Sequence, residues 1–193
     1  MSVIRAFIAV DLSTEIQDRL SQIASQLKER MGDVPVRWVA PKNVHLTLKF
    51  LGDVSMNNIM MLTELLRAEA ALHKPMTISV GGMGAFPKVR NPRVIWVGVE
   101  VPQELVALQR AIDIQTGKVG YARDKRPFSP HLTLGRVSRN ASPHEVRRIA
   151  DVLKNHKVGY LGVARVREVH LYRSDLKPTG AVYSKVFTAT FGE

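Results

Sequence analysis

The chain has 193 residues, of which 45% are hydrophobic and 23% charged, and these ordinary globular values exclude a largely disordered protein. Its 28 lysines and arginines against 17 acidic residues give a net charge of +11, which favours a polyanionic partner. No cysteine is present, so disulfides, thiolate zinc sites and a cysteine nucleophile are excluded. The length predicts a single domain, residues 1–193, with two lobes.

The residue pattern in the first half of the chain predicts alternating strands and helices. Residues 3–10 are rich in β-forming side chains, and the helix expected after Ser13 carries an apolar residue every three or four positions up to residue 31. Further elements are expected as strands at 36–39, 44–52, 76–80 and 92–99, and as helices from 55 to about 70 and from 102. The glycine cluster at 81–84 lacks the lysine of a phosphate loop and predicts a bulge.

The second half opens with a loop, residues 118–129, that mixes basic and aromatic side chains. Such a loop suits single-stranded nucleic acid, whose phosphates meet cations and whose bases stack on rings, although a solvated basic loop is an equal alternative. A helix over 142–154 and strands over 163–172 and 181–191 follow, the strands joined by a turn at 178–180. Paired strands between single helices predict the α+β class.

The tetrapeptide His-Leu-Thr-Leu occurs twice, at His45 and at His131. Both copies alternate polar and apolar residues, so each histidine shares one strand face with a threonine, Thr47 or Thr133, while the leucines take the other face. The copies lie 131 − 45 = 86 residues apart. We therefore expect two similar lobes from an internal duplication, with antiparallel sheets that face a central groove and helices packed outside.

The chemistry of the two histidines follows by elimination. No His-x-x-x-His helix or acidic cluster lies near either motif, so no metal site is expected, and no Gly-x-Ser-x-Gly elbow indicates a serine hydrolase. Two imidazoles can act as one acid and one base near neutral pH. Such a pair suits in-line displacement at phosphorus in a strained cyclic phosphate, and the net charge indicates that this phosphate is attached to RNA.

Two His-hydrophobic-Thr-hydrophobic motifs in a duplicated α+β domain are the signature of the two-histidine phosphoesterase superfamily. Within it, the chain most resembles the bacterial and archaeal RNA 2′,3′-cyclic phosphodiesterases, once named 2′-5′ RNA ligases. Apart from the motifs, the segments that carry the resemblance are 5–11, 37–39, 84–87, 94–98, 126–128 and 171–174.

The resemblance implies hydrolysis of a 2′,3′-cyclic phosphate at an RNA 3′ end to a 2′-phosphomonoester, without a metal or other cofactor. It implies that His45 donates a proton, that His131 accepts one, and that Thr47 and Thr133 bind the phosphate. It also places Arg136 near the phosphate, although strict strand alternation turns Arg136 away from His131 unless a bulge at Gly135 re-aims it.

Other side chains receive weaker expectations. The alternation puts Lys49 on the face of His45, where a wet rim of the groove is its expected place and a phosphate contact the alternative. Phe7, Trp38 and Phe128 are candidates to stack on the terminal base or to join the core. His170 has no threonine two residues on, and we expect no catalytic role for it.

Two alternatives stay open. The same site can join RNA ends through a 2′-5′ bond as a minor reverse reaction, or the motifs can form a non-catalytic module that binds RNA ends or phosphate. The expected partner is RNA with a 2′,3′-cyclic phosphate terminus, tRNA fragments included, with no protein partner and a monomeric state. The short apolar N-terminal stretch contains Arg5, so neither a signal peptide nor a membrane span is expected, and the absence of cysteine fits the cytoplasm.

Overall fold

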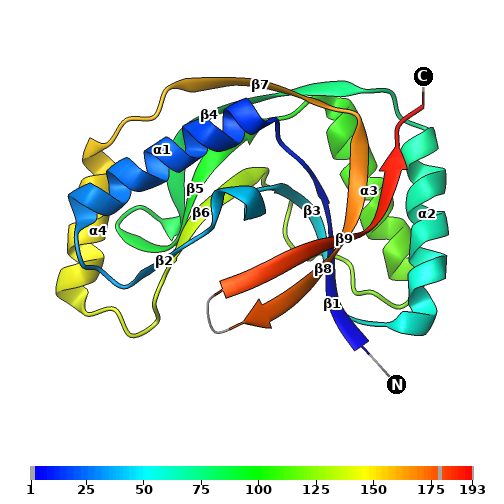
Figure 1. The fold of residues 1–193 in the computed structure, drawn as a ribbon, viewed down its shortest axis with the longest axis horizontal. Coiled ribbons are helices and arrows are strands. Elements are labelled where there is room, and N and C mark those ends of the chain that lie inside the picture. Colours follow the sequence, from blue (N-terminus) through cyan, green and yellow to red (C-terminus); the bar gives the residue numbers. More distant parts are fainter. Residues whose placement is uncertain (1–2, 178–179, 193) are drawn as a thin grey trace.

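Four α-helices and nine strands make up the part of the chain that the computed structural model describes, residues 3–177 and 180–192, and the strands form two antiparallel sheets (Figure 1). The expected α+β class and the expected antiparallel sheets are therefore confirmed. Helices α2 and α3 pack on one sheet and helices α1 and α4 on the other, and the two helix pairs lie at opposite ends of the view in Figure 1.

The first sheet has four strands in the order β3-β1-β8-β9. Its strands are β3 (Leu46–Ser55), β1 (Val3–Val10), β8 (Glu168–Lys177) and β9 (Gly180–Thr190). Helix α2 (Ile59–Ala71) packs on β8 and β9, and helix α3 (Gln103–Lys118) packs on β3 and on α2. This sheet carries the first histidine motif at the start of β3.

The second sheet has five strands in the order β2-β6-β5-β4-β7. Its strands are β2 (Val36–Trp38), β6 (His131–Val137), β5 (Asn91–Glu100), β4 (Met76–Lys88) and β7 (Tyr160–Val166). Helix α1 (Thr14–Met31) packs on β6, β7 and α4, and helix α4 (Pro143–Asn155) packs on β5. This sheet carries the second motif in β6.

The two halves of the chain exchange elements. Helix α1 and strands β2 and β4 come from the first half but join the lobe of the second motif, whereas α3, β8 and β9 come from the second half and join the lobe of the first motif. Each lobe is therefore built from both ends of the chain, and the strands β3 and β6 that follow the two histidines contact each other.

Local sequence signals explain the helix boundaries. Helix α1 begins where the Ser13 hydroxyl accepts a hydrogen bond from the Ile16 amide at 3.5 Å, and it ends at Gly32, whose φ of 63° favours glycine. Helix α4 begins with a capping box between Ser142 and Glu145. The apolar stripe predicted for α1 is buried along its whole length, at Ile16, Leu20, Ile23, Leu27 and Met31.

Two expectations about strands need comment. The single strand expected over 163–172 is wrong, because β7 and β8 are separate strands in different sheets, on either side of Arg167. Apolar residues alternate on both sides of this break and neither glycine nor proline marks it, so the pattern hides the change of sheet. The bulge expected at the glycine cluster is confirmed by a register shift between Gly81 and Met83, and β4 continues beyond it. Residues 178–179 of the expected turn at 178–180 lie outside the described residues.

Candidate active site

The two motifs occupy equivalent places in the two lobes. His45 lies one residue before β3, after a 3-10 turn over Pro41–Asn43, and His131 is the first residue of β6. Both histidines are half-buried, whereas Leu46 and Leu132 are fully buried in the core. The predicted division of each motif into a leucine face and a histidine face is therefore confirmed.

Each imidazole is oriented by the backbone two residues upstream. Nδ1 of His131 lies 2.7 Å from the Ser129 carbonyl oxygen. A carbonyl oxygen only accepts hydrogen bonds, so Nδ1 carries a hydrogen and donates the hydrogen bond. Neutral His131 therefore presents an Nε2 with a free lone pair. His45 forms a corresponding hydrogen bond with the backbone of Asn43. Two equivalent backbone contacts thus fix the rings of the two histidines.

The surroundings of the two rings differ. The Phe7 ring stacks on His45 with centroids 4.7 Å apart, and Tyr183 meets His45 edge-on at 5.3 Å. His131 has a single edge-on aromatic contact of this kind among the described residues, with Phe86 at 4.9 Å. Burial against these rings lowers the pKa of His45 to about 4, although the Asn43 hydrogen bond opposes the shift.

The threonines share a surface with the histidines. Thr47 lies opposite Ala9 of β1, and Thr133 lies opposite Trp96 of β5. In the first sheet, Phe7, Ala9 and Tyr172 lie on this surface and form a small hydrophobic cluster that is separate from the main core. We call the two sheet surfaces that carry the histidine motifs the groove faces.

A β-bulge follows each threonine and changes which later side chains point into the groove. In β3 the register shifts at Leu48, so Thr47 pairs with Ala9 and Lys49 pairs with Ile8 of the core face. In β6 the register shifts at Leu134, so Gly135 pairs with Ile95 of the core face. The two bulges occupy equivalent positions of the duplicated motif.

The second bulge turns Arg136 into the groove. Arg136 pairs with Val94, two residues before Trp96, and therefore lies on the groove face with Thr133. Burial raises the pKa of Tyr183, and the charges of Arg136 and Arg5 oppose this rise. Tyr183 belongs to β9 of the first sheet, so this effect of Arg136 acts between the two sheets, whose strands β3 and β6 contact each other. The bulge expected beside Arg136 is present, one residue earlier than predicted.

The first bulge turns Lys49 away from the groove, so the expectation of a wet rim is wrong. Lys49 is 1% exposed, and its Nζ lies 2.6 Å from Asp113 Oδ1 and 2.7 Å from the Ala122 carbonyl oxygen. Asp113 also accepts a hydrogen bond from the Arg123 Nε at 3.1 Å. Burial raises the pKa of Asp113, but the hydrogen bonds from Lys49, the Asp124 amide and Arg123 outweigh it and lower the pKa. Lys49 thus ties β3 to α3 and to the loop that leads to His131.

Asp11 is a groove residue that the sequence interpretation missed. Its carboxylate accepts hydrogen bonds from the Tyr172 hydroxyl at 2.6 Å and forms an ion pair with Lys185 at 2.7 Å. Burial raises the pKa of Asp11, but the hydrogen bonds from Lys185 and Tyr172 outweigh it and lower the pKa. Asp11 follows β1 on the same face as Phe7 and Ala9, and this alternation was the signal for it.

His170 lies beside this carboxylate. Its Nε2 is 3.5 Å from Asp11 and its Nδ1 is 2.9 Å from the Thr188 hydroxyl, and the side chain is buried. A hollow of about 300 Å³ opens next to His45 and is lined in part by Asp11, Lys42 and Lys185. The ring of His45 therefore faces a basic and aromatic recess, whereas His170 is buried and does not line it.

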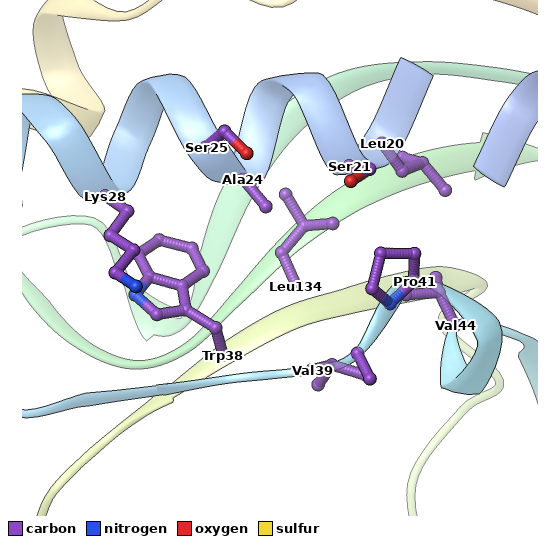
Figure 2. Close-up of a pocket in the computed structure, with 11 residues that line it drawn as sticks. Leu20, Ser21, Ala24, Ser25, Lys28, Trp38, Val39, Pro41, Val44 and Leu134 are labelled. Carbon is purple, nitrogen blue, oxygen red and sulfur yellow. The ribbon is translucent and has the colours of Figure 1, made fainter. Parts of the chain in front are cut away.

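The three aromatic candidates all pack against the protein interior. Phe7 is 3% exposed, with Tyr172 as well as His45 stacked on it, so its expected alternative as a core residue is confirmed. Trp38 packs beneath α1 beside Lys28 and Leu134, at a hollow of about 280 Å³ on the core side of β2 (Figure 2). Phe128 is half-buried against the core. Phe50, which the sequence pattern did not single out, is 65% exposed and pairs with Phe7 on the groove face.

Metal-ligand clusters and membrane-spanning helices are both absent from residues 3–177 and 180–192. No group of three or more His, Cys, Asp or Glu side chains is arranged to hold a metal ion in this part of the chain. No helix within it is long and apolar enough to cross a membrane.

The profile of the LigT-like phosphoesterases matches the chain twice, over residues 10–96 and 97–183. The chain belongs to this family. The two matches confirm the internal duplication, since each copy in this LigT-like phosphoesterase contains one histidine motif.

Named relatives align over most of this LigT-like chain. It is 39% identical to the RNA 2′,3′-cyclic phosphodiesterase of Methanothermobacter thermautotrophicus, with 94% of this chain and 95% of the relative covered. It is 37% identical to the protein of the same name from Archaeoglobus fulgidus, with 93% and 96% covered. The Escherichia coli protein of that name is 32% identical, with 71% and 74% covered.

Solved structures share the fold of this LigT-like phosphoesterase. A Thermus thermophilus protein superposes with a TM-score of 0.80 at 26% identity, with 98% of this chain and 100% of the other covered. Escherichia coli LigT complexed with 3′-AMP superposes with a TM-score of 0.77 at 25% identity, with 100% of both chains covered.

Proposed function

We propose that this protein hydrolyses the 2′,3′-cyclic phosphate at the 3′ end of RNA to a 2′-phosphomonoester, with His45 as proton donor and His131 as proton acceptor. The observation that carries the proposal is the repeated arrangement of an imidazole held by its upstream backbone beside a threonine hydroxyl, once on each groove face. The names of the relatives support the same activity.

The reaction is an in-line displacement. Nε2 of His131 takes a proton from water as the water oxygen attacks phosphorus, and the bond from phosphorus to the 3′ oxygen breaks on the opposite side. His45 gives its proton to the departing 3′ oxygen, which leaves a 3′-hydroxyl and a 2′-phosphate. Thr47 and Thr133 donate hydrogen bonds to the non-bridging oxygens, and Arg136 stabilises their negative charge.

His45 must gain its proton when the substrate binds. With a pKa of about 4 in the free protein, it is neutral at pH 7. The negative charge of a bound cyclic phosphate favours the imidazolium and raises this pKa. The Ser129 contact leaves His131 with a free Nε2 lone pair, and this supports its role as the acceptor. The Asn43 contact leaves neutral His45 with the same free Nε2, so the assignment of donor and acceptor comes from the family resemblance and not from these backbone contacts.

The wider proposal covers the whole molecule. Residues 1–193 work as one two-lobed domain, because each groove face needs strands from both halves of the chain. The acid and base are both imidazoles, so we propose a reaction independent of metals and other cofactors. We also propose a cytoplasmic monomer that acts on RNA ends, tRNA fragments included. Joining of RNA ends through a 2′-5′ bond is a minor reverse reaction, because water outcompetes a 5′-hydroxyl.

The test is incubation with a short RNA that ends in a 2′,3′-cyclic phosphate, in EDTA, followed by identification of the product isomer. The parent should form a 2′-phosphate, and His45→Ala and His131→Ala should each lower the rate by about 10² to 10⁴. His144→Ala is the matched control, because His144 is exposed on α4. Circular dichroism checks that each variant is folded.

The outcomes separate the alternatives. Full activity in a folded His45 or His131 variant contradicts the acid–base pair. A 3′-phosphate product shows that the 2′ oxygen leaves instead. Loss of activity in EDTA that returns with a divalent cation contradicts metal independence. No turnover by the parent, with RNA binding retained in both variants, favours the non-catalytic binding module.

A further inference from the structure

A second basic hollow lies at the end of the β2–β6 strand pair, outside the histidine site. It has a volume of about 560 Å³ and is lined by Arg37, Arg136 and Arg139, together with segments 34–36 and 137–138. A hydrogen bond of 2.8 Å from the Ser138 amide to the Pro35 carbonyl joins its two walls. We call this feature the arginine hollow.

The charges of the arginine hollow are unbalanced. Arg37 and Arg136 are directly opposite each other on paired antiparallel strands, an arrangement in which like charges destabilise a sheet. In the described part of the chain, no carboxylate forms an ion pair with either residue or with Arg139. An anion bound between the guanidinium groups relieves this repulsion, and guanidinium geometry suits phosphate oxygens.

The arginine hollow shares the groove face of β6 with Thr133 but is distant from the reacting phosphorus. Thr133 and Arg136 lie on the same face of β6, so a polyanion that follows this strand from His131 reaches the hollow. A strand rises about 3.3 Å per residue, which puts the backbone of Arg136 about 15 Å along β6 from His131. The long Arg136 side chain spans part of this distance toward the cyclic phosphate, whereas Arg37 and Arg139 stay at the hollow. The anion that fills the hollow is therefore a different group from the cyclic phosphate.

We propose that the arginine hollow binds a phosphodiester group of the RNA chain upstream of the cyclic end. This inference rests on the proposed function and deepens it, because it makes an RNA oligonucleotide the preferred substrate over a cyclic mononucleotide. A single nucleotide held between the histidines leaves the hollow empty. A longer RNA places its upstream phosphate between Arg37 and Arg139. Arg136 lies between this phosphate and the cyclic phosphate, on the groove face of β6.

The test compares kcat/KM for 2′,3′-cyclic AMP with kcat/KM for an RNA tetranucleotide that ends in a 2′,3′-cyclic phosphate. Arg37→Ala and Arg139→Ala should each lower the tetranucleotide value about tenfold and leave the mononucleotide value unchanged. The salt dependence of tetranucleotide binding should weaken by about 0.7 in log–log slope for each phosphate that a variant no longer neutralises. Arg37→Lys, which keeps the charge, should restore part of the binding.

The control is Arg165→Ala, because Arg165 is an exposed arginine on β7, at the opposite edge of the same sheet. If the parent hydrolyses both substrates and the variants leave their ratio unchanged, the arginine hollow is not a substrate site, and the proposed function stands. This holds also where a variant lowers kcat/KM equally for both substrates. If the parent hydrolyses neither substrate, it is the proposed function that fails.

Discussion

His45 lies against the face of Phe7, and this contact sets its acid–base behaviour. The burial that lowers its pKa to about 4 keeps the free imidazole neutral at physiological pH. In the unfolded chain the same group titrates near its ordinary value of about 6.5. Between these two values the unfolded state binds more protons than the folded state, so the difference in pKa affects stability as well as catalysis.

We expect His45 to make the protein less stable as the pH falls from about 6.5 to about 4. In this window its contribution to the free energy of unfolding drops by about 1.4 kcal/mol per pH unit, and below pH 4 the drop stops. Urea unfolding of the parent and of His45→Gln across pH 4 to 8 measures this difference. Burial also lowers the pKa values of His156 and His170, but their effects cancel in the comparison.

Titration of His45 by NMR gives the second half of the check. The pKa should rise when a nucleoside 2′-phosphate occupies the groove, because the added negative charge favours the imidazolium. Equal pKa values with and without the nucleotide, or parallel stability curves for the parent and His45→Gln, would contradict this account of His45.

The sequence predicted which residues of each motif face the groove, and the reason is local. Histidine and threonine two positions apart must share a strand face, and the buried Leu46 and Leu132 fix which face this is. Asp11 was equally accessible to this argument, as the next groove-side position after Ala9. The aromatic rings that bury His45 and lower its pKa come from β1 and β9, which are distant in sequence, so no pattern around residue 45 contains them.

At the scale of elements, the two bulges determine which side chains after each motif face the groove, and strict strand alternation could not predict this. Each bulge adds one residue after the motif threonine. As a result, Lys49 and Gly135 occupy equivalent positions that face the core. The next residues, Phe50 and Arg136, occupy equivalent positions that face the groove. Glycine is needed at 135 because a Cβ there would lie 2.9 Å from Val36 and 3.1 Å from the Trp38 ring. A bulge depends on pairing with a strand that is distant in sequence. For this reason the prediction from strand alternation put Lys49 on the wrong face of β3.

The ion pair of Lys49 joins three elements and supports a prediction about them. Lys49→Met leaves the Asp113 carboxylate buried without its main partner, and we expect the free energy of unfolding to fall by about 3 to 5 kcal/mol. The loop held by this pair ends at Ser129, whose carbonyl orients His131, so kcat should fall as well. Urea unfolding and steady-state kinetics measure the two effects.

The double variant Lys49→Met/Asp113→Leu is the control for this prediction. It removes both charges together, so it should recover much of the stability that Lys49→Met loses. Strictly additive losses in the double-mutant cycle would mean that the two side chains do not depend on each other. Unchanged kcat in the single variant would separate the ion pair from the position of His131.

At the scale of the whole molecule, the exchange of elements between the lobes should make unfolding a single event. Both tryptophans, Trp38 and Trp96, lie in the five-stranded sheet, so their fluorescence reports one lobe, whereas circular dichroism reports both. We expect the two signals to change at the same urea concentration. A fluorescence midpoint that differs from the circular dichroism midpoint would show that the lobes unfold separately.

The sequence predicted two similar lobes, but it did not predict which elements build each of them. The repeated motif and the alternation of strands and helices follow from residues close together in the chain. The assignment of β2 to the second sheet and of β8 to the first depends on long-range pairing, such as Arg37 with Arg136 and Ala9 with His170. Local periodicity is the same whichever lobe receives the strand.

The exchange of α1, β2 and β4 for α3, β8 and β9 also bears on the origin of the chain. A protein with one copy of the repeat would have a histidine strand whose sheet lacked the strands that the other copy now supplies. Two such copies would complete each other only by trading segments, as an intertwined pair with two-fold symmetry. The arrangement of this chain is what fusion of the two genes of such a swapped homodimer would produce. On this view the groove began as a subunit interface, and its two histidines were once the same residue.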